Sequence, residues 1–132
     1  MHTRHVFTLI ISLTLVLFSV SGAMSEEITV DQAVVCQEII DRMPVGAGDV
    51  IPVGSERVFC FTRINGAQGE TEITHNWYYK GVLKASVVLP VRNSEWRTWS
   101  SKTLLPEWTG EWMVEVLSKD GTPLESLIFF VQ

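Results

Sequence analysis

The chain has 132 residues, five tryptophans, two cysteines and a formal net charge of −5. This length suits a single domain with one hydrophobic core. An acidic chain gains little from the counterion release that drives DNA and RNA binding, so we expect no nucleic-acid partner. The same charge disfavours general adhesion to anionic lipid.

The first 23 residues have the pattern of a secretory signal peptide. Arg4 precedes an apolar run over residues 6–20, which is short for a membrane-spanning helix of about 20 apolar residues. The small residues Ser21-Gly22-Ala23 follow, as at a signal-peptidase site. We therefore expect cleavage after Ala23, a single mature domain over 24–132 with no stable membrane span, and a periplasmic or secreted location. An uncleaved anchor is the alternative.

The mature part alternates in hydrophobicity with period two, which predicts β-strands. The segment over 44–54, with two prolines and three glycines, predicts a surface loop. Lys80-Gly81 predicts a tight hairpin, and Asp120-Gly121 predicts a two-residue hairpin. The last strand is apolar on both faces, so we expect both faces to be covered. In chain order, the predicted strands cover residues 33–40 (alternatively a short helix at its start), 57–64, 73–79, 83–91, 96–102, 112–117 and 127–131.

About seven strands with turns between them predict an all-β fold of two packed antiparallel sheets. We expect an immunoglobulin-like antiparallel β-sandwich in the broad sense. Cys36 and Cys60 are an even number of cysteines in an exported domain, which predicts one disulfide joining the first two strands. Two buried thiols are the alternative. The pair differs from that of an antibody domain, because no tryptophan lies between the cysteines.

Four segments together carry a family resemblance. They are Arg-Val-Phe-Cys-Phe-Thr at 57–62, Thr-His-Asn-Trp-Tyr-Tyr at 74–79, Trp-Arg-Thr-Trp-Ser-Ser-Lys at 96–102, and Pro-Glu-Trp-Thr-Gly-Glu-Trp at 106–112. From Arg57 onward the chain resembles the bacterial family catalogued as domain of unknown function 2914. The resemblance implies an envelope or exported domain, often joined to membrane segments. It implies no established activity and supplies no catalytic or ligand-binding residues.

Few residues offer catalytic chemistry. His75 is a candidate general base, and Ser100 with Lys102 is a candidate nucleophile pair. His75 shares strand parity with apolar neighbours, so we favour a buried neutral imidazole that is hydrogen-bonded on both nitrogens. The Ser-x-x-Lys spacing of penicillin-binding enzymes is absent, and we interpret Glu107 and Glu111 as solvated side chains at a turn. We therefore expect no catalytic residues, no metal site and no cofactor.

The tryptophan cluster supports the binding hypotheses. Trp96 and Trp99 are three residues apart, so they are expected on opposite faces of a strand. Trp112 is expected in the core and Trp108 in a corner, which leaves core packing as one interpretation of the cluster. The other interpretation is a platform that stacks against a sugar or a protein. Its candidate binding residues are Trp99, Trp108, Arg97 and Lys102.

Two functions follow from these patterns. The first is a non-catalytic interaction or assembly module of the bacterial cell envelope, whose partner is an envelope protein. The alternative is a glycan-binding or cell-wall-binding module that uses exposed tryptophans. A small hydrolase is the least favoured possibility.

Overall fold

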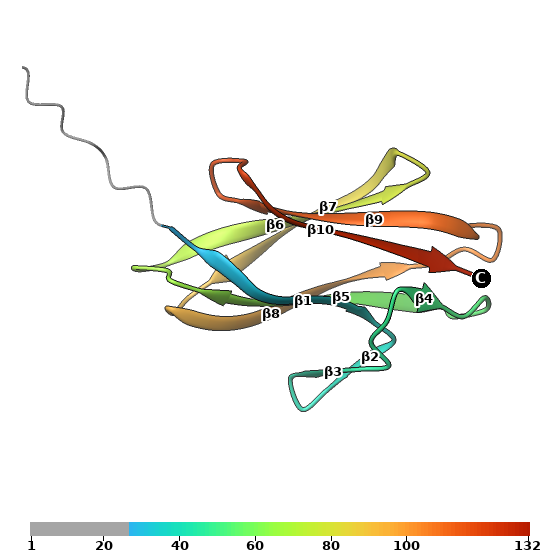
Figure 1. Ribbon diagram of the computed structural model, residues 1–132, viewed down its shortest axis with the longest axis horizontal. Coiled ribbons are helices and arrows are strands. Elements are labelled where there is room, and N and C mark those ends of the chain that lie inside the picture. Colours follow the sequence, from blue (N-terminus) through green and yellow to red (C-terminus); the bar gives the residue numbers. More distant parts are fainter. Residues whose placement is uncertain (1–26) are drawn as a thin grey trace, which may run out of the picture.

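The computed structural model describes residues 27–132, so the predicted signal peptide lies outside the described part. The described chain is all-β, and none of its elements is a helix that could cross a membrane (Figure 1). Its strands are β1 (Thr29–Cys36), β2 (Glu38–Ile40), β3 (Met43–Val45), β4 (Val50–Ile51), β5 (Arg57–Asn65), β6 (Thr71–Tyr79), β7 (Val82–Val91), β8 (Glu95–Thr103), β9 (Gly110–Ser118) and β10 (Pro123–Val131).

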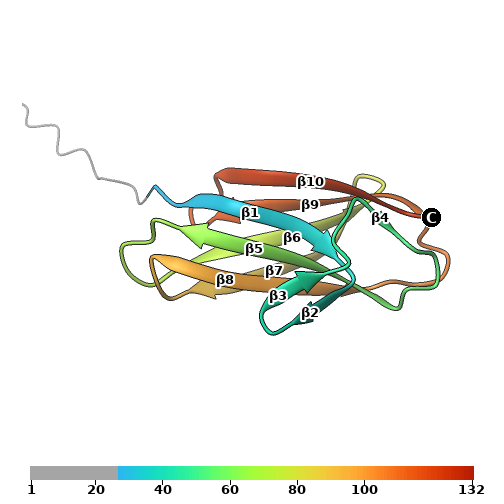
Figure 2. The same ribbon diagram turned by 60° about the horizontal axis from the view of Figure 1, so that its bottom comes forward.

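The strands form two facing sheets (Figures 1 and 2). One sheet has the order β1-β5-β8 and is antiparallel. The other has the order β4-β10-β9-β6-β7, in which only the short β4 pairs in parallel. The two-stranded hairpin β2–β3 lies on the outer side of the three-stranded sheet (Figure 2). The all-β prediction is confirmed, with ten strands where about seven were expected.

The three additional strands are short. Strand β2 lies within the predicted strand 33–40, which the structure divides at Gln37. The predicted loop 44–54 is wrong at 44–45 and at 50–51, which belong to β3 and β4. Asp41 and Arg42 have φ values of 51° and 61° and form the turn of the β2–β3 hairpin. Positive φ at both central residues belongs to a type I′ turn, for which Asn-Gly is the usual signal. Asp-Arg gives no such signal. Strand β4 has two residues and depends on its pairing with β10.

The two predicted hairpin turns have different outcomes. Lys80 and Gly81 have φ values of 47° and 80°, so the tight turn between β6 and β7 is confirmed. The predicted two-residue turn at Asp120-Gly121 is wrong. There the Ser118 amide donates to the Thr122 carbonyl at 2.9 Å, so three residues form the loop, with Gly121 at φ 85°. Glycine at this position is typical of a type I turn followed by a bulge.

The core lies between the two sheets and has two apolar clusters. One contains the aromatic side chains Trp77, Trp112 and Phe129, whose rings pack edge-on or stacked at centroid distances of 6.0–6.2 Å. The other is smaller and lies toward the start of β1. Buried aromatic residues contribute much of the apolar area of a small core. Residues of the smaller cluster are Ile28, Ile64, Ala67, Ile73, Val91 and Val116.

The outer face of β10 differs from expectation. Phe129 and Val131 point into the core, but Ile128 and Phe130 are 54% and 38% exposed. The prediction that both faces of this strand are covered is therefore wrong. The five-stranded sheet has a single partner sheet, so its second face stays open.

The predicted Cys36–Cys60 disulfide is also wrong for this structure. The cysteines lie on the neighbouring strands β1 and β5, yet both are buried free thiols. Val35 is opposite Cys60, whereas Cys36 is opposite Phe59, so the two cysteines are offset by one residue. Successive side chains of a strand point to opposite faces. Cys60 therefore points into the core, and Cys36 points to the outer face near the β2–β3 hairpin.

We expect both thiols to be detected only after unfolding. Burial raises the pKa of Cys36 and of Cys60, which leaves little of the reactive thiolate. Protein purified without reductant should release almost no thionitrobenzoate from Ellman's reagent when folded, and two equivalents in guanidinium. A sample reduced and then unfolded is the control. No release in guanidinium from the unreduced sample would establish the disulfide and contradict the register.

Candidate functional site

His75, the candidate base, lies in the core between the two sheets and is fully buried. Its Nδ1 is 2.6 Å from the Ser100 hydroxyl oxygen, and its Nε2 is 3.3 Å from the Thr62 hydroxyl oxygen. Trp77 donates its indole N–H to the same Ser100 oxygen at 3.0 Å. Thr62 donates its hydroxyl to the Thr98 carbonyl at 2.8 Å. These contacts form a continuous hydrogen-bonded chain across the core.

The two ends of this chain determine the position of each proton. An indole N–H can only donate and a carbonyl can only accept. Because Thr62 donates to a carbonyl, it accepts from Nε2–H of His75. Nδ1 of His75 then accepts from the Ser100 hydroxyl. The imidazole is therefore neutral and bonded on both nitrogens, as predicted, and burial lowers the pKa of His75 to about 4. Both nitrogens and the Ser100 hydroxyl are used within the core, which favours a structural role.

The lowered pKa of His75 predicts acid sensitivity. The unfolded chain protonates this residue near pH 6.5 and the folded chain near 4. The neutral His75 side chain therefore contributes its full stability above pH 6.5. This stability is lost as the pH falls toward 4, because the unfolded chain binds the proton more readily than the folded chain. Between pH 7 and 5 the free energy of unfolding should fall by about 2 kcal/mol on account of this group.

Urea unfolding of the wild type and of His75→Gln at pH 7, 6 and 5 measures this loss. The variant should be less stable at pH 7, yet its free energy of unfolding should decline less with acid. Above pH 5 most carboxylates stay ionised in both proteins, so they contribute little to the difference. Equal declines in the two proteins would contradict the neutral buried imidazole.

The structure separates the predicted binding residues onto two surfaces. Trp99 and Arg97 lie on the outer face of β8, where the Trp99 ring stacks on Phe61 at 6.3 Å and 15°. Trp108 and Lys102 meet elsewhere, beside the loop that joins β8 to β9. Trp96 packs against the smaller core cluster, so the prediction of opposite faces for Trp96 and Trp99 is confirmed. The four candidates do not form a single platform.

Trp108 belongs to an aromatic–lysine cluster, which we define as Tyr79, Trp108, Trp112, Lys80, Lys84 and Lys102. The Tyr79 ring lies 4.9 Å from Trp112 and 6.2 Å from Trp108, and the two tryptophans are 5.7 Å apart. Trp112 donates its indole N–H to the Trp108 carbonyl at 3.1 Å. The Tyr79 hydroxyl donates to the Thr109 carbonyl at 2.7 Å. These bonds fix the corner that presents the partly exposed Trp108.

Three of the four lysines of the chain gather at this cluster. The ammonium nitrogens of Lys84 and Lys102 lie 5.4 and 5.1 Å from the Trp108 ring, and that of Lys80 lies 5.3 Å from the Tyr79 ring. These distances are typical of cation–π contacts. Sequence reasoning found Trp108 and Lys102. It missed Lys80 and Lys84, because only strand pairing brings the β6–β7 turn to this corner.

The outer face of the five-stranded sheet carries an apolar row. Four side chains are in register across neighbouring strands: Ile128 on β10, Met113 on β9, Tyr78 on β6 and Leu83 on β7. Phe130 is two residues from Ile128, and Val50 is opposite Phe130. We call these six residues the apolar row.

The charged side chains beside the apolar row are carboxylates. Glu111 is opposite Phe130, and Glu115 is opposite Asn76. Glu72 is opposite Pro90 farther along the same face. No lysine or arginine occupies the positions just named or those of the apolar row. The face therefore combines exposed apolar area with negative charge.

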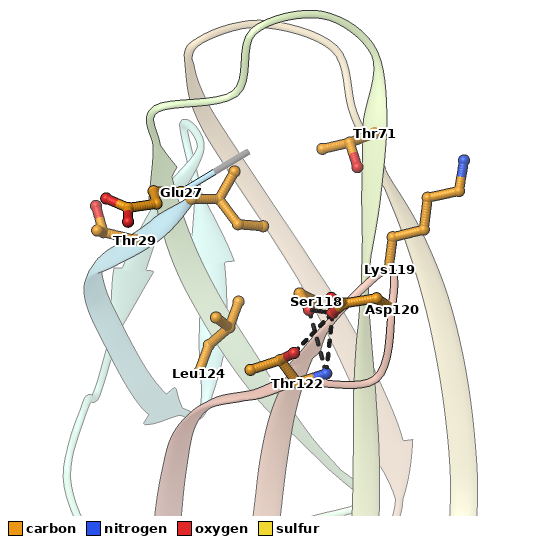
Figure 3. Close-up of a pocket in the computed structure, with 9 residues that line it drawn as sticks. Glu27, Thr29, Thr71, Ser118, Lys119, Asp120, Thr122 and Leu124 are labelled. Carbon is orange, nitrogen blue, oxygen red and sulfur yellow. Dashed lines mark hydrogen bonds between the residues drawn. The ribbon is translucent and has the colours of Figure 1, made fainter. Parts of the chain in front are cut away.

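A hollow of about 720 Å³ opens at the end of the sandwich where β1 begins, beside the β9–β10 turn (Figure 3). Ile28 and Leu124 supply its apolar wall. Asp120 lies on its rim and accepts hydrogen bonds from the hydroxyls of Ser118 and Thr122. These bonds, that from Ser118 first, lower the pKa of Asp120. The polar groups of the rim thus bond to one another within the turn, as the dashed lines in Figure 3 show.

Metal-ligating side chains do not converge anywhere in residues 27–132, where no group of three such residues could hold an ion.

Comparison with known families gives a match over the C-terminal part of the chain. Residues 70–131 match the model of a family described as Protein of unknown function (DUF2914). This segment contains β6 to β10, and it confirms the predicted resemblance for those strands. The predicted extent from Arg57 to residue 69 lies outside the match. No curated protein matches the chain.

Proposed function

For this chain, whose residues 70–131 carry the DUF2914 match, we propose the function of an exported, non-catalytic interaction module. Its place is the periplasm or the outside of the cell, as a part of envelope assembly. Export rests on the signal-peptide pattern of residues 1–23. The observation that carries the interaction role is the exposed apolar row on the five-stranded sheet.

A protein is the partner that this row fits. Soluble monomers rarely expose contiguous apolar patches, and larger ones mark interaction sites. Leu83 and Ile128 are each more than half exposed, although they lie in register with Met113 and Tyr78. Tyrosine, methionine and phenylalanine are enriched at protein interfaces. A flat apolar sheet face with a polar rim suits a second packed surface.

The carboxylates beside the row define the partner's charge. Glu111 and Glu115 border the row on β9. A second copy packed on the same face would bring these carboxylates toward their own counterparts, and juxtaposed like charges are costly. We therefore propose a different protein, with an apolar centre flanked by lysine or arginine.

Site-specific photocrosslinking in the cell tests this assignment. A benzophenone side chain at position 83 or 128 should crosslink one and the same partner. A probe at Ile40, which is 50% exposed on the β2–β3 hairpin beside the other sheet, is the matched control and should not. Mass spectrometry of the crosslinked peptide should find lysine or arginine beside apolar residues.

Three results would contradict the proposal. They are equal capture from position 40, a crosslink only to another copy of this chain, or no crosslink from either face position. Glu111→Lys should reduce capture of the proposed partner several-fold, because charge reversal replaces attraction by repulsion.

We also infer an immunoglobulin-like arrangement of the sandwich. With the long strands lettered A, B, C, C′, E, F and G in chain order, the sheets would be A-B-E and G-F-C-C′. In this lettering Trp77 lies on strand C and Cys60 on strand B, and both belong to the larger core cluster. A buried tryptophan on strand C beside a cysteine of strand B is a hallmark of immunoglobulin domains. Strand β9 has no cysteine, so the usual bridge to strand F is replaced by packing.

The second candidate function is binding of an acidic glycan at the aromatic–lysine cluster. Aromatic faces stack on sugar rings, and lysines attract carboxylate groups. Here Lys84 and Lys102 both approach the ring of the partly exposed Trp108. The collection of three lysines at one corner of an acidic protein favours an anionic saccharide over a neutral one.

Titration with polygalacturonate, followed by tryptophan emission, tests this candidate. Lys84→Gln and Lys102→Gln should each weaken binding several-fold, because each removes one cation at the Trp108 ring. Lys119→Gln is the matched control and should bind like the wild type, since Lys119 lies in the β9–β10 turn. Equal binding of neutral dextran, or an equal loss in Lys119→Gln, would contradict an acidic-glycan site.

A further inference from the structure

We propose that the outer face of the three-stranded sheet binds an oxyanion between Arg63 and Arg97. This surface is separate from the apolar row and from the aromatic–lysine cluster, because it lies on the opposite side of the sandwich under the β2–β3 hairpin (Figure 2). The proposal therefore stands independently of the protein partner and of the acidic glycan.

The first observation is the pairing of two arginines. Arg63 on β5 is directly opposite Arg97 on β8, and Gln32 on β1 is opposite Arg63 from the other side. Side chains opposite one another in antiparallel strands have Cβ atoms about 5 Å apart, and like charges at such positions destabilise the sheet. An anion held between the two guanidinium groups would remove this repulsion.

The second observation is an unsatisfied donor. Nε of Arg63 is buried and has no hydrogen-bond partner, and it is the only such side-chain atom within residues 27–132. Buried donors without partners are rare, and charged ones are costly. A bound oxyanion that accepts from this N–H would satisfy it, once the Arg63 side chain turns to bring the buried Nε to the ligand.

Arg97 also keeps hydrogen-bonding capacity. Its Nη1 lies 3.5 Å from the Arg42 carbonyl and 3.4 Å from the Met43 sulfur. The first distance is at the limit for a hydrogen bond, and thioether sulfur is a weak acceptor. Glu95, two residues before Arg97 on the same strand face, is exposed to solvent. Arg97 thus points its Nη1 toward the hairpin, and its Nε and Nη2 groups make no hydrogen bond within residues 27–132.

The surroundings of the two arginines strengthen an ionic contact. In the next row of the sheet Phe61 is fully buried and stacks on Trp99, which forms an apolar wall. The turn of the β2–β3 hairpin lies beside Arg97 and contributes a third cation, Arg42. The Arg42 guanidinium is 5.9 Å from the Trp96 ring. Electrostatic attraction is stronger where water is partly excluded.

These features select a ligand group with several oxygens. A guanidinium presents parallel N–H donors that match a carboxylate or phosphate oxygen pair. Two opposed guanidinium groups suit a carboxylate, a phosphate or a sulfate, which share this chemistry.

NMR of the arginine Nε–H groups tests the site directly in the wild-type protein. Inorganic phosphate and acetate are titrated separately, with chloride at matched ionic strength as the reference. We expect the Arg63 Nε–H resonance to shift saturably with one or both oxyanions and to stay fixed with chloride. Saturation by phosphate alone assigns the site to a phosphate-bearing ligand, and saturation by acetate alone assigns it to a carboxylate. An unsaturable shift, or an equal shift with chloride, would overturn the proposal.

Variants give a second readout. Arg63→Gln and Arg97→Gln should each weaken oxyanion binding by about tenfold, as expected for loss of charge-assisted hydrogen bonds. Arg57→Gln is the control, because Arg57 lies on the same strand but donates to the Ser101 hydroxyl at 2.7 Å. An equal effect in the control would show that general positive charge binds the anion, which contradicts a specific site. If a variant fails to fold, the wild-type titration still decides.

Discussion

The hydrogen-bonded chain through His75 is the constraint on which the arrangement of the two sheets depends. It joins β6 of the five-stranded sheet to β5 and β8 of the three-stranded sheet, and it lies between the two apolar clusters. Apolar packing tolerates small shifts, but the hydrogen-bonded chain through His75 needs each donor opposite its acceptor. A one-residue slip of β8 would turn Ser100 outward and leave Nδ1 of His75 and the indole N–H of Trp77 without partners. The core therefore specifies the register as well as burying apolar area.

Once the inner faces are fixed, strand alternation fixes the outer faces, and these faces differ in charge. The five-stranded sheet presents the apolar row with Glu111 and Glu115. The three-stranded sheet presents Arg63 and Arg97. Three of the four lysines meet at one corner. The protein therefore has separate negative and positive surfaces, although its net charge is −5. Such separation supports the proposed interaction module, since surfaces of opposite charge attract different chemistry.

The long strands and their faces could be predicted because alternation is a local signal. It placed Trp96 and Trp99 on opposite faces and His75 in the core. The β2–β3 hairpin was missed because Asp41 and Arg42 adopt positive φ without glycine or asparagine. The disulfide was predicted from cysteine count, yet bonding depends on a one-residue offset between strands. The exposure of Ile128 was missed because an apolar strand in the sequence does not reveal whether one sheet or two will cover it.

The candidate binding residues show the same division between local and long-range information. Arg97 and Lys102 were identified from their spacing around the tryptophans, but their neighbours come from other strands. Arg63 enters only through pairing of β5 with β8, and Lys84 only through the turn beside Trp108. The distribution of hydrogen bonds then separates structural from binding roles. The polar groups of the buried His75 chain bond to one another, whereas the unpaired buried donor, Arg63 Nε, lies toward the outer face of a sheet. The buried donor left unpaired within residues 27–132 thus belongs to a side chain of an outer sheet face, which supports the proposed oxyanion site there.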